Sequence, residues 1–252
     1  MIGIANAISL GMSGASGGAP AFHPSDVAGC IEFWDSTVPG DRVMSGSNLT
    51  SWTGRLGGHI LLPAGTGNII ELPAEINAQP VIQTNGTTNW LECSTVTLPT
   101  PATTPTWIVA FWRIDTISSF DQVFGAKRVG GYNISIFSNG SGAGLQQSNG
   151  TSVNSNAGPG LGAWERLEAY FDGSGSPGTE YLKRRATSVN TGNPGNTTPA
   201  AGIVIGTRGN GDATTFCRVS LGALGLYSAQ PSAPNKTLID GWHTSTFGAG
   251  YV

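Results

Sequence analysis

The run from Trp164 to Phe171 constrains the fold most, because its side chains alternate between apolar and polar types. Successive side chains of a β-strand point to opposite faces. One face would therefore carry Leu167, Ala169 and Phe171, and the other would carry Arg166, Glu168 and Tyr170. This pattern is typical of an antiparallel sheet with its polar side in solvent. Together with the apolar runs 203–206 and 216–227, the strand is predicted to close a β-sandwich.

Further short apolar runs, rich in Val, Ile, Phe, Trp and Tyr, have the composition of β-strands. They span residues 30–34, 57–62, 81–84, 90–93, 107–112, 121–125, 132–137 and 144–147. The run 107–112 is apolar on both faces, which predicts a central strand. The runs 81–84 and 90–93 flank Asn85-Gly86, which predicts a hairpin with a longer loop. Glycines within 216–227 predict a bulge.

Long helices are not expected, since only 11% of the residues are charged, 38 are glycine, and the good helix formers are concentrated nowhere. One short helix is predicted over residues 232–243. Pro234 suits its first turn, and Leu238, Ile239 and Trp242 form an apolar stripe. The predicted fold class is all-β: a two-sheet antiparallel jelly-roll sandwich with an extended N-terminal arm and one short C-terminal helix.

Residues 1–22 are predicted to form a flexible arm, and residues 23–252 one jelly-roll domain, because no central linker divides the rest of the chain. The arm has an apolar tip followed by the glycine-rich stretch 11–19. Two interpretations stay open: a disordered terminus, or an anchor that orders against a neighbouring subunit. The anchoring side chains would be Ile2, Ile4, Ile8 and Leu10. Residues 1–10 are too few to cross a membrane and lack the basic start of a signal peptide.

Charge and cysteine content exclude several classes of function. The formal net charge is −3, and the basic residues cluster only at 127–128 and 183–185, so a nucleic-acid partner is not expected. Cys30, Cys93 and Cys217 lie in apolar runs and are predicted to be small buried hydrophobes. The odd count leaves at least one unpaired, and the chain does not look like a disulfide scaffold. This fits folding in a reducing cytoplasm.

The order of these segments resembles that of concanavalin A-like, LamG-type jelly rolls. The resemblance covers residues 24–248 and rests on 29–36, Trp52, 79–86, Trp90-Leu91, 164–167, Asp172-Gly173, Ile205-Gly206, 221–224 and a late helix ending near Phe247-Gly248. The opening Met1-Ile2-Gly3-Ile4, followed by a glycine-rich arm, is similar to small virion proteins of tailed phages that carry such domains. The resemblance implies a sandwich that binds carbohydrate or protein, used on virions for decoration, fibres or spikes.

Some relatives with this fold are glycoside hydrolases, which need two carboxylates in one cleft, about 5–10 Å apart. Glu165 and Glu168 are three residues apart and would point to opposite faces of a strand, and the same holds for Glu32 and Asp35. Glu71 and Glu75 have the right spacing, but the proline between them predicts a loop. No catalytic carboxylate pair is therefore predicted, and the chain is predicted not to be an enzyme.

Other chemistry finds little support in the sequence. The three histidines, His23, His59 and His243, have no triad-like neighbours, and His23 is predicted to be a plain loop residue. Several relatives bind calcium through loop aspartates. Asp121, Asp172 and Asp212 are isolated acids without the spacing of a calcium loop, so calcium stays open but unsupported, and no cofactor or metal site is predicted.

Aromatic side chains beside polar loops are candidates to stack on sugar rings. Trp52, Trp90 and Tyr132 are the predicted ligand-binding residues, with burial in the core as the alternative for each. The predicted function is a non-enzymatic phage virion protein, in head decoration, a fibre or a tail spike, that attaches to host glycans. Its partners would be capsid or tail proteins and further copies of itself, held through residues 1–22. The alternatives are a carbohydrate-binding module of a secreted bacterial protein, which would need a signal peptide, and a glycoside hydrolase.

Overall fold

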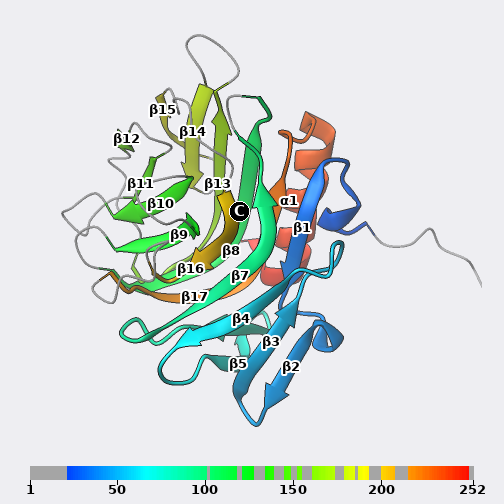
Figure 1. The fold of residues 1–252 in the computed structure, drawn as a ribbon. Helices are drawn as coiled ribbons and strands as arrows, with labels where there is room; N and C mark the ends of the chain where they lie inside the picture. Colours follow the sequence, from blue (N-terminus) through cyan, green and yellow to red (C-terminus); the bar gives the residue numbers. More distant parts are fainter. Residues whose placement is uncertain are drawn as a thin grey trace, which may run out of the picture.

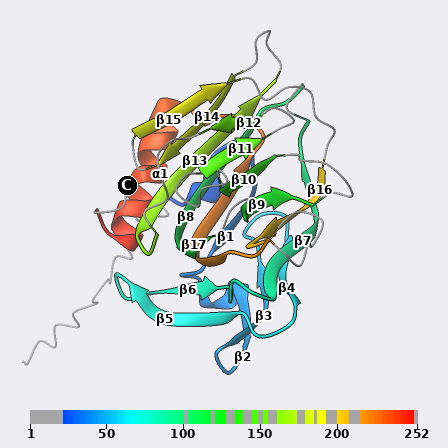
Figure 2. The same cartoon turned by 90° about the vertical axis from the view of Figure 1, so that its left-hand side faces the viewer.

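The structure, a computed structural model, describes residues 22–100, 103–117, 121–127, 134–138, 145–148, 152–154, 161–173, 179–184, 187–192, 200–207 and 215–249. These residues form two antiparallel sheets packed face to face, with one helix on the outer side of sheet A (Figure 1 and Figure 2). The predicted all-β sandwich with a late helix is confirmed. The arm lies outside the described residues up to residue 21, and so do Ile2, Ile4, Ile8 and Leu10.

Sheet A is built around β8 (Thr106–Thr116), which pairs with β13 (Trp164–Asp172) and β17 (Arg218–Tyr227). Beyond β13 follow β14 (Thr179–Arg184) and β15 (Thr187–Gly192). The other side of β17 pairs with β6 (Gln79–Gln83) and β1 (Cys30–Asp35), and β6 pairs with β5 (Ile70–Ile76). A hairpin of β2 (Arg42–Ser45) and β3 (Asn48–Thr53) joins β5 through one residue pair. Short 3-10 turns, η1 (Pro24–Asp26) and η2 (Pro39–Asp41), flank β1.

Sheet B runs in the order β4 (Ile60–Gly65), β7 (Asn89–Leu98), β16 (Ala200–Ile205), β9 (Gln122–Ala126), β10 (Ser135–Ser138), β11 (Leu145–Ser148) and β12 (Ser152–Asn154). Strand β4 also pairs with β3, so it links the two sheets at one edge. The central position predicted for residues 107–112 is confirmed in β8. The bulge predicted in 216–227 is confirmed as a register shift between Leu221 and Ala223 of β17.

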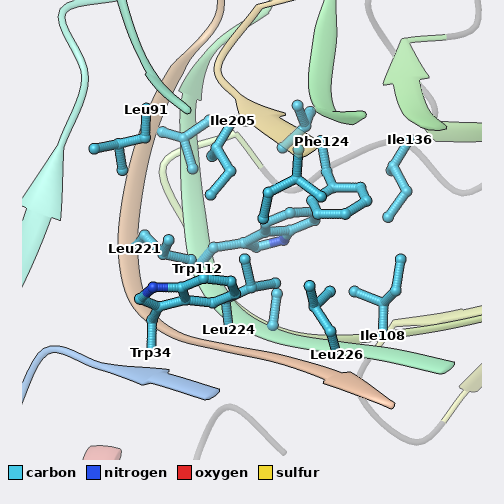
Figure 3. Close-up of a cluster of buried hydrophobic side chains, with 14 of the residues drawn as sticks. Trp34, Leu91, Ile108, Trp112, Phe124, Ile136, Ile205, Leu221, Leu224 and Leu226 are labelled. Carbon is cyan, nitrogen blue, oxygen red and sulfur yellow. The ribbon is translucent and has the colours of Figure 1, made fainter. Parts of the chain in front are cut away.

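The main core lies between the sheets (Figure 3). Sheet B contributes Leu91, Phe124, Ile136 and Ile205, which face Trp34, Ile108, Trp112, Leu221, Leu224 and Leu226 of sheet A. The predicted inner face of β13 is confirmed, because Leu167, Ala169 and Phe171 all belong to this core. Burying each large apolar side chain contributes roughly 1.5–3 kcal/mol, so this layer dominates the stability of the sandwich.

The helix α1 (Ala233–Phe247) extends further than predicted and buries a different stripe. Ile239, His243 and Phe247, four residues apart, face sheet A, whereas Leu238 is 47% exposed, so the predicted place of Leu238 in the buried stripe is wrong. The helix covers a second apolar cluster on the outer side of sheet A, where the rings of Phe247 and Phe111 stack at 4.2 Å.

The predicted polar, solvent-facing side of β13 is also wrong. Arg166, Glu168 and Tyr170 are 5%, 3% and 8% exposed. The helix lies over this face and supplies charged partners, since Lys236 contacts Glu168 and Asp240 contacts Arg166. A strand whose polar face is covered by a helix with charged side chains shows the same alternating pattern as a strand whose polar face is in solvent. The sequence pattern therefore does not distinguish a covered face from an exposed one.

The hairpin predicted from residues 81–84 and 90–93 does not form. Strand β6 belongs to sheet A and β7 to sheet B, so the loop around Asn85-Gly86 crosses from one sheet to the other. Glu71 and Glu75 do not lie in a loop as predicted, but in β5, whose register breaks between Leu72 and Ile76.

The cysteines follow their prediction closely. Cys93 and Cys217 are buried, Cys30 is half-buried, and all three are free. Within the described part of the chain, no helix is long and apolar enough to cross a membrane.

Candidate functional site

A hollow of about 240 Å³ opens at one edge of the sandwich. It forms where the β4–β5 loop, the end of β6 with the loop after it, and the start of β17 come together. The lining residues are Asn68, Ile70, Gln83, Thr84, Asn85 and Arg218. Amides, a hydroxyl and one guanidinium therefore surround it, and no carboxylate stands among the described residues that line it.

The loop after β6 is shaped by Asn85. Its side-chain Oδ1 accepts hydrogen bonds from the backbone N–H groups of Thr87, Thr88 and Asn89, a local bonding pattern that holds a tight turn. Gly86 follows with φ at +72°, and a Cβ there would lie 2.7 Å from the Cβ of Arg218. Glycine is thus needed both for the backbone conformation and for the close approach to β17.

The floor of the hollow is a connected polar network. The Gln83 side chain donates through Nε2 to Asp115 at 3.1 Å and to Ser220 at 2.8 Å. Its Oε1 accepts from Nη2 of Arg218 at 2.8 Å. Asp115 in turn accepts from Nε of Arg113 at 2.6 Å. Both ends of the Gln83 amide are occupied, so the amide and the guanidinium resting on it are held in place.

An aromatic pair, Trp90 and Phe216, stands close along the chain to residues that line the hollow, Asn85 and Arg218. Their rings stack with centroids 5.9 Å apart, and Phe216 stands two residues before Arg218 on the chain. The Trp90 indole N–H donates to Glu92 at 3.2 Å, and Glu92 accepts from Lys127 at 3.1 Å. Both rings are half-buried, so part of each surface remains open to solvent. We call Trp90 and Phe216 the aromatic shelf.

The structure describes two of the three predicted ligand-binding aromatics, Trp52 and Trp90, and places them in different surroundings. Trp52 is 0% exposed within the main core, so its ring cannot meet a surface ligand, and that prediction is wrong. A position beside a polar loop did not indicate exposure here, because β3 directs the Trp52 side chain into the core between the sheets. Tyr132 lies outside the described residues. Of the two that are described, Trp90 is the one with a partly exposed side chain, and it stacks on Phe216.

Sequence reasoning missed Phe216, Gln83 and Arg218. One signal was present, since Arg218 is the only charged residue in the apolar run 216–227. Its partner, Gln83, lies in β6, more than 130 residues earlier in the chain. Only the pairing of β17 with β6 brings the two residues together.

The carboxylates weighed for catalysis have structural partners. Glu71 pairs with Arg42, and Glu75 pairs with Arg113, so the two do not share a site. Glu32 is fully buried, and its carboxylate accepts from the backbone N–H groups of residues 56, 57 and 59. Of the predicted isolated acids, Asp212 lies outside the described residues. No group of three potential metal ligands occurs among the residues that are described.

His23 is more than the loop residue predicted. Its Nδ1 lies 2.7 Å from Oγ of Ser25, and its Nε2 lies 3.2 Å from Oδ2 of Asp35, so serine, histidine and aspartate meet in space. The contacts belong to a helix cap, because Nδ1 also accepts from the backbone N–H of Ser25 and Asp26 accepts from the backbone N–H of His23. Ser25 is 9% exposed, and the arrangement fastens η1 to the end of β1.

Comparison with models of protein families and with curated proteins gives no match. Solved structures share the fold. Domain 4 of AbnA, a GH43 extracellular arabinanase from Geobacillus stearothermophilus solved with arabinotriose, aligns at a TM-score of 0.57 and 14% identity, over 85% of this chain and 98% of that one.

Two further structures are similar over only part of their own length. The botulinum neurotoxin serotype C1 binding domain aligns at a TM-score of 0.55 and 10% identity, over 86% of this chain and 52% of that one. Trypanosoma rangeli sialidase aligns at 0.55 and 15% identity, over 88% of this chain and 34% of that one. At these identities the likeness concerns the fold, and it agrees with the lectin-like jelly-roll sandwich that the sequence resembles.

Proposed function

We propose that this protein is a non-catalytic glycan-binding domain whose ligand lies on the aromatic shelf and reaches into the hollow. The observation that carries the proposal is a stacked, half-buried pair of rings, Trp90 and Phe216, a few residues along the chain from the amides and the guanidinium that line a hollow. Carbohydrate sites combine the same two elements. An aromatic face packs against the apolar face of a sugar ring, while amides and cations bond its hydroxyls.

The size of the hollow fits a sugar better than a larger apolar ligand. Its volume of about 240 Å³ is below the roughly 300–1,000 Å³ of pockets that enclose drug-sized molecules. One sugar ring can enter, and the next ring of a chain would lie over the shelf. The arabinanase domain supports the proposal, because nearly all of that domain aligns with this chain and it was solved with a trisaccharide.

The proposal includes binding without cleavage, and the described lining supports this part. Glycosidases use two carboxylates about 5–10 Å apart at the scissile bond. The described lining of the hollow holds none, and the nearby acids Glu75 and Asp115 both contact Arg113. Reducing ends released from a glycan that binds, and lost when one carboxylate is replaced by its amide, would instead favour the hydrolase alternative.

A glycan panel tests the proposal. Wild-type protein and the variants Trp90→Ala and Phe216→Ala are screened by calorimetry against neutral and acidic oligosaccharides. We expect at least one ligand for the wild type and a loss of about tenfold or more for each variant, from lost ring stacking. Trp242→Ala, at a half-buried tryptophan of α1, is the control for loss of stability, and it should keep the affinity. Equal affinity of Trp90→Ala and wild type would contradict the proposal.

A second candidate, a structural role in a tailed-phage virion, has one observation in its favour. The outer face of β2, β3 and β4 exposes three aliphatic side chains, with Val43 56%, Ile60 40% and Leu62 47% exposed. Among the described residues β2 pairs with β3 alone, which leaves an edge open to a further strand. We propose that residues 1–22 of a neighbouring copy dock there by strand addition.

Deletion of residues 1–18 tests that role. The truncated protein should keep its melting temperature but lose self-association, measured by sedimentation. Leu62→Ser should lose self-association too, and Leu238→Ser, at a leucine with the same exposed fraction on α1, should not. A truncated protein that associates like the full chain would rule the arm out as an anchor.

A further inference from the structure

We propose that the hollow selects a sugar that carries a carboxylate, such as a sialic or uronic acid, and that Arg218 binds that carboxylate. The inference rests on the proposed glycan function and adds the chemical class of the ligand. Its basis is Arg218 itself, the one cation among the described residues of the lining, an exposed arginine at the start of β17 whose guanidinium is held by a glutamine amide.

Arg218 differs from its counterparts in its partners. Arg42, Arg55, Arg113 and Arg166 each pair with a carboxylate of the protein. Within the described part of the chain, Arg218 has no carboxylate partner and makes one side-chain hydrogen bond, to Oε1 of Gln83. A guanidinium has five N–H donors in a planar fork, so most of its donors remain for a ligand.

Gln83 decides which way the fork points. Because its Nε2 donates to Asp115 and Ser220, its Oε1 must face Arg218. Rotating the amide by half a turn would set an NH₂ group against the guanidinium and lose three hydrogen bonds. Arg218 is therefore oriented before a ligand arrives, which lowers the conformational entropy lost on binding.

The carboxylate closest to this network, Asp115, has a cation of its own. Asp115 accepts from Nε of Arg113 at 2.6 Å and from the Ser220 hydroxyl at 2.9 Å. Glu75 contacts the other end of the Arg113 guanidinium. The acids behind the floor thus share Arg113, and the charge of Arg218 at the open side has no such neutralising contact from the described residues.

The neighbouring groups suit the rest of an acidic sugar. Asn68 lines the same hollow, and its amide can bond hydroxyl or acetamido groups. Phe216 of the aromatic shelf stands two residues before Arg218 on the chain, so we propose that the apolar face of the same ligand packs on the shelf. A carboxylate takes two parallel N–H bonds from a guanidinium, which a neutral hydroxyl cannot.

Matched pairs of ligands provide the test. Calorimetric titrations compare sialyllactose with lactose, and an oligogalacturonate with its methyl ester of the same length. We expect each acid to bind about tenfold or more tightly than its neutral partner, as a charge-assisted hydrogen bond implies. The preference should shrink as salt is raised, because the contact is partly exposed.

Variants then locate the effect. Arg218→Gln should abolish the preference for the acid and leave the affinity for the neutral partner nearly unchanged. Arg218→Lys keeps the positive charge but lacks the planar guanidinium, so it should retain part of the preference for the acidic ligand. Arg55→Gln, at an exposed arginine paired with Asp41 elsewhere, is the matched control and should keep the full preference.

The outcomes separate the two proposals. Equal binding of acid and neutral partners would overturn the carboxylate inference and leave glycan binding standing. A preference for the acid that persists in Arg218→Gln would also overturn the carboxylate inference, since a residue other than Arg218 would then bind the carboxylate of the ligand. Absence of binding to every member of the panel would overturn both.

Discussion

Lys236 of α1 donates to Glu168 of β13, with its Nζ 2.9 Å from Oε1 of the carboxylate, and this contact joins the helix to the outer face of sheet A. Glu168 also accepts from Nε1 of Trp107 at 3.2 Å. Burial would raise the pKa of Glu168, but the hydrogen bond from Lys236 and the charge of Arg166 outweigh it and lower the pKa. The carboxylate is thus ionised at neutral pH. It contributes stability that is lost as the pH falls below the ordinary pKa of a glutamate and through the lowered pKa of Glu168.

We predict that Lys236→Met destabilises the protein by about 3 kcal/mol at pH 7, because it leaves a buried carboxylate without its closest cation. The double variant Lys236→Met/Glu168→Gln should lose less than the sum of the two single variants. Urea unfolding measures all three. The exposed pair of Arg55 and Asp41 is the control, and Arg55→Met should cost about 1 kcal/mol or less. Additive losses would show that the two residues do not act as a pair.

His243 should make the fold sensitive to acid. Its ring is fully buried between α1 and sheet A, and burial first, then the charge of Arg166, lowers its pKa from 6.5 to about 3. The neutral ring lies with Nδ1 3.0 Å from the carbonyl oxygen of Ile239, to which it donates. Below about pH 6 the unfolded chain takes up a proton that the folded chain refuses, so stability falls as the pH is lowered.

The expected slope is about 1.4 kcal/mol per pH unit between pH 6 and pH 4 from this residue alone. His243→Met removes the titrating group and should flatten the curve of unfolding free energy against pH by that amount. Urea unfolding of both proteins at pH 7, 6, 5 and 4 gives the difference directly. Parallel curves for the two proteins would contradict the burial of a neutral imidazole.

Gly65 lies directly against the Trp90 ring of the aromatic shelf. A Cβ at this position would lie 2.1 Å from the backbone oxygen of Thr88 and 2.5 Å from Cζ3 of Trp90, and the φ of Gly65 is +81°. We predict that Gly65→Ala displaces both the Thr88 backbone and the Trp90 indole, and weakens glycan binding about tenfold, as measured by calorimetry. Gly46→Ala is the matched control, because Gly46 also has a positive φ, +63°, but nothing lies within 4 Å of a Cβ there. It should lose stability by roughly 1–2 kcal/mol and keep its affinity.

Strand periodicity predicted the inner layer of this fold well. The alternation of Leu167, Ala169 and Phe171 depends only on local geometry, and it places these residues in the core wherever the sheet packs. The other face of β13 was mispredicted because the partner that buries it, α1, comes more than sixty residues later. Local patterns cannot tell solvent from a helix that brings its own charges.

The candidate site was predictable only in part. Trp90 was identified by its position beside a polar loop, but the same argument chose Trp52, which β3 turns into the core. Arg218 and Gln83 contribute to a site only together, and the pairing of β17 with β6 brings them into contact. Sites assembled from strands distant in sequence carry no local motif, so composition and spacing alone do not identify them.

Indole N–H signals in a ¹⁵N-correlated NMR spectrum test the glycan site most directly. The chain has seven tryptophans, and Trp34, Trp52, Trp107 and Trp112 are fully buried or nearly so. The tightest ligand of the panel is titrated into labelled protein, with Trp90 assigned through the Trp90→Phe variant. The account predicts that the Trp90 signal moves most and that those four keep their positions. A Trp90 signal that stays unchanged at saturating ligand would contradict it.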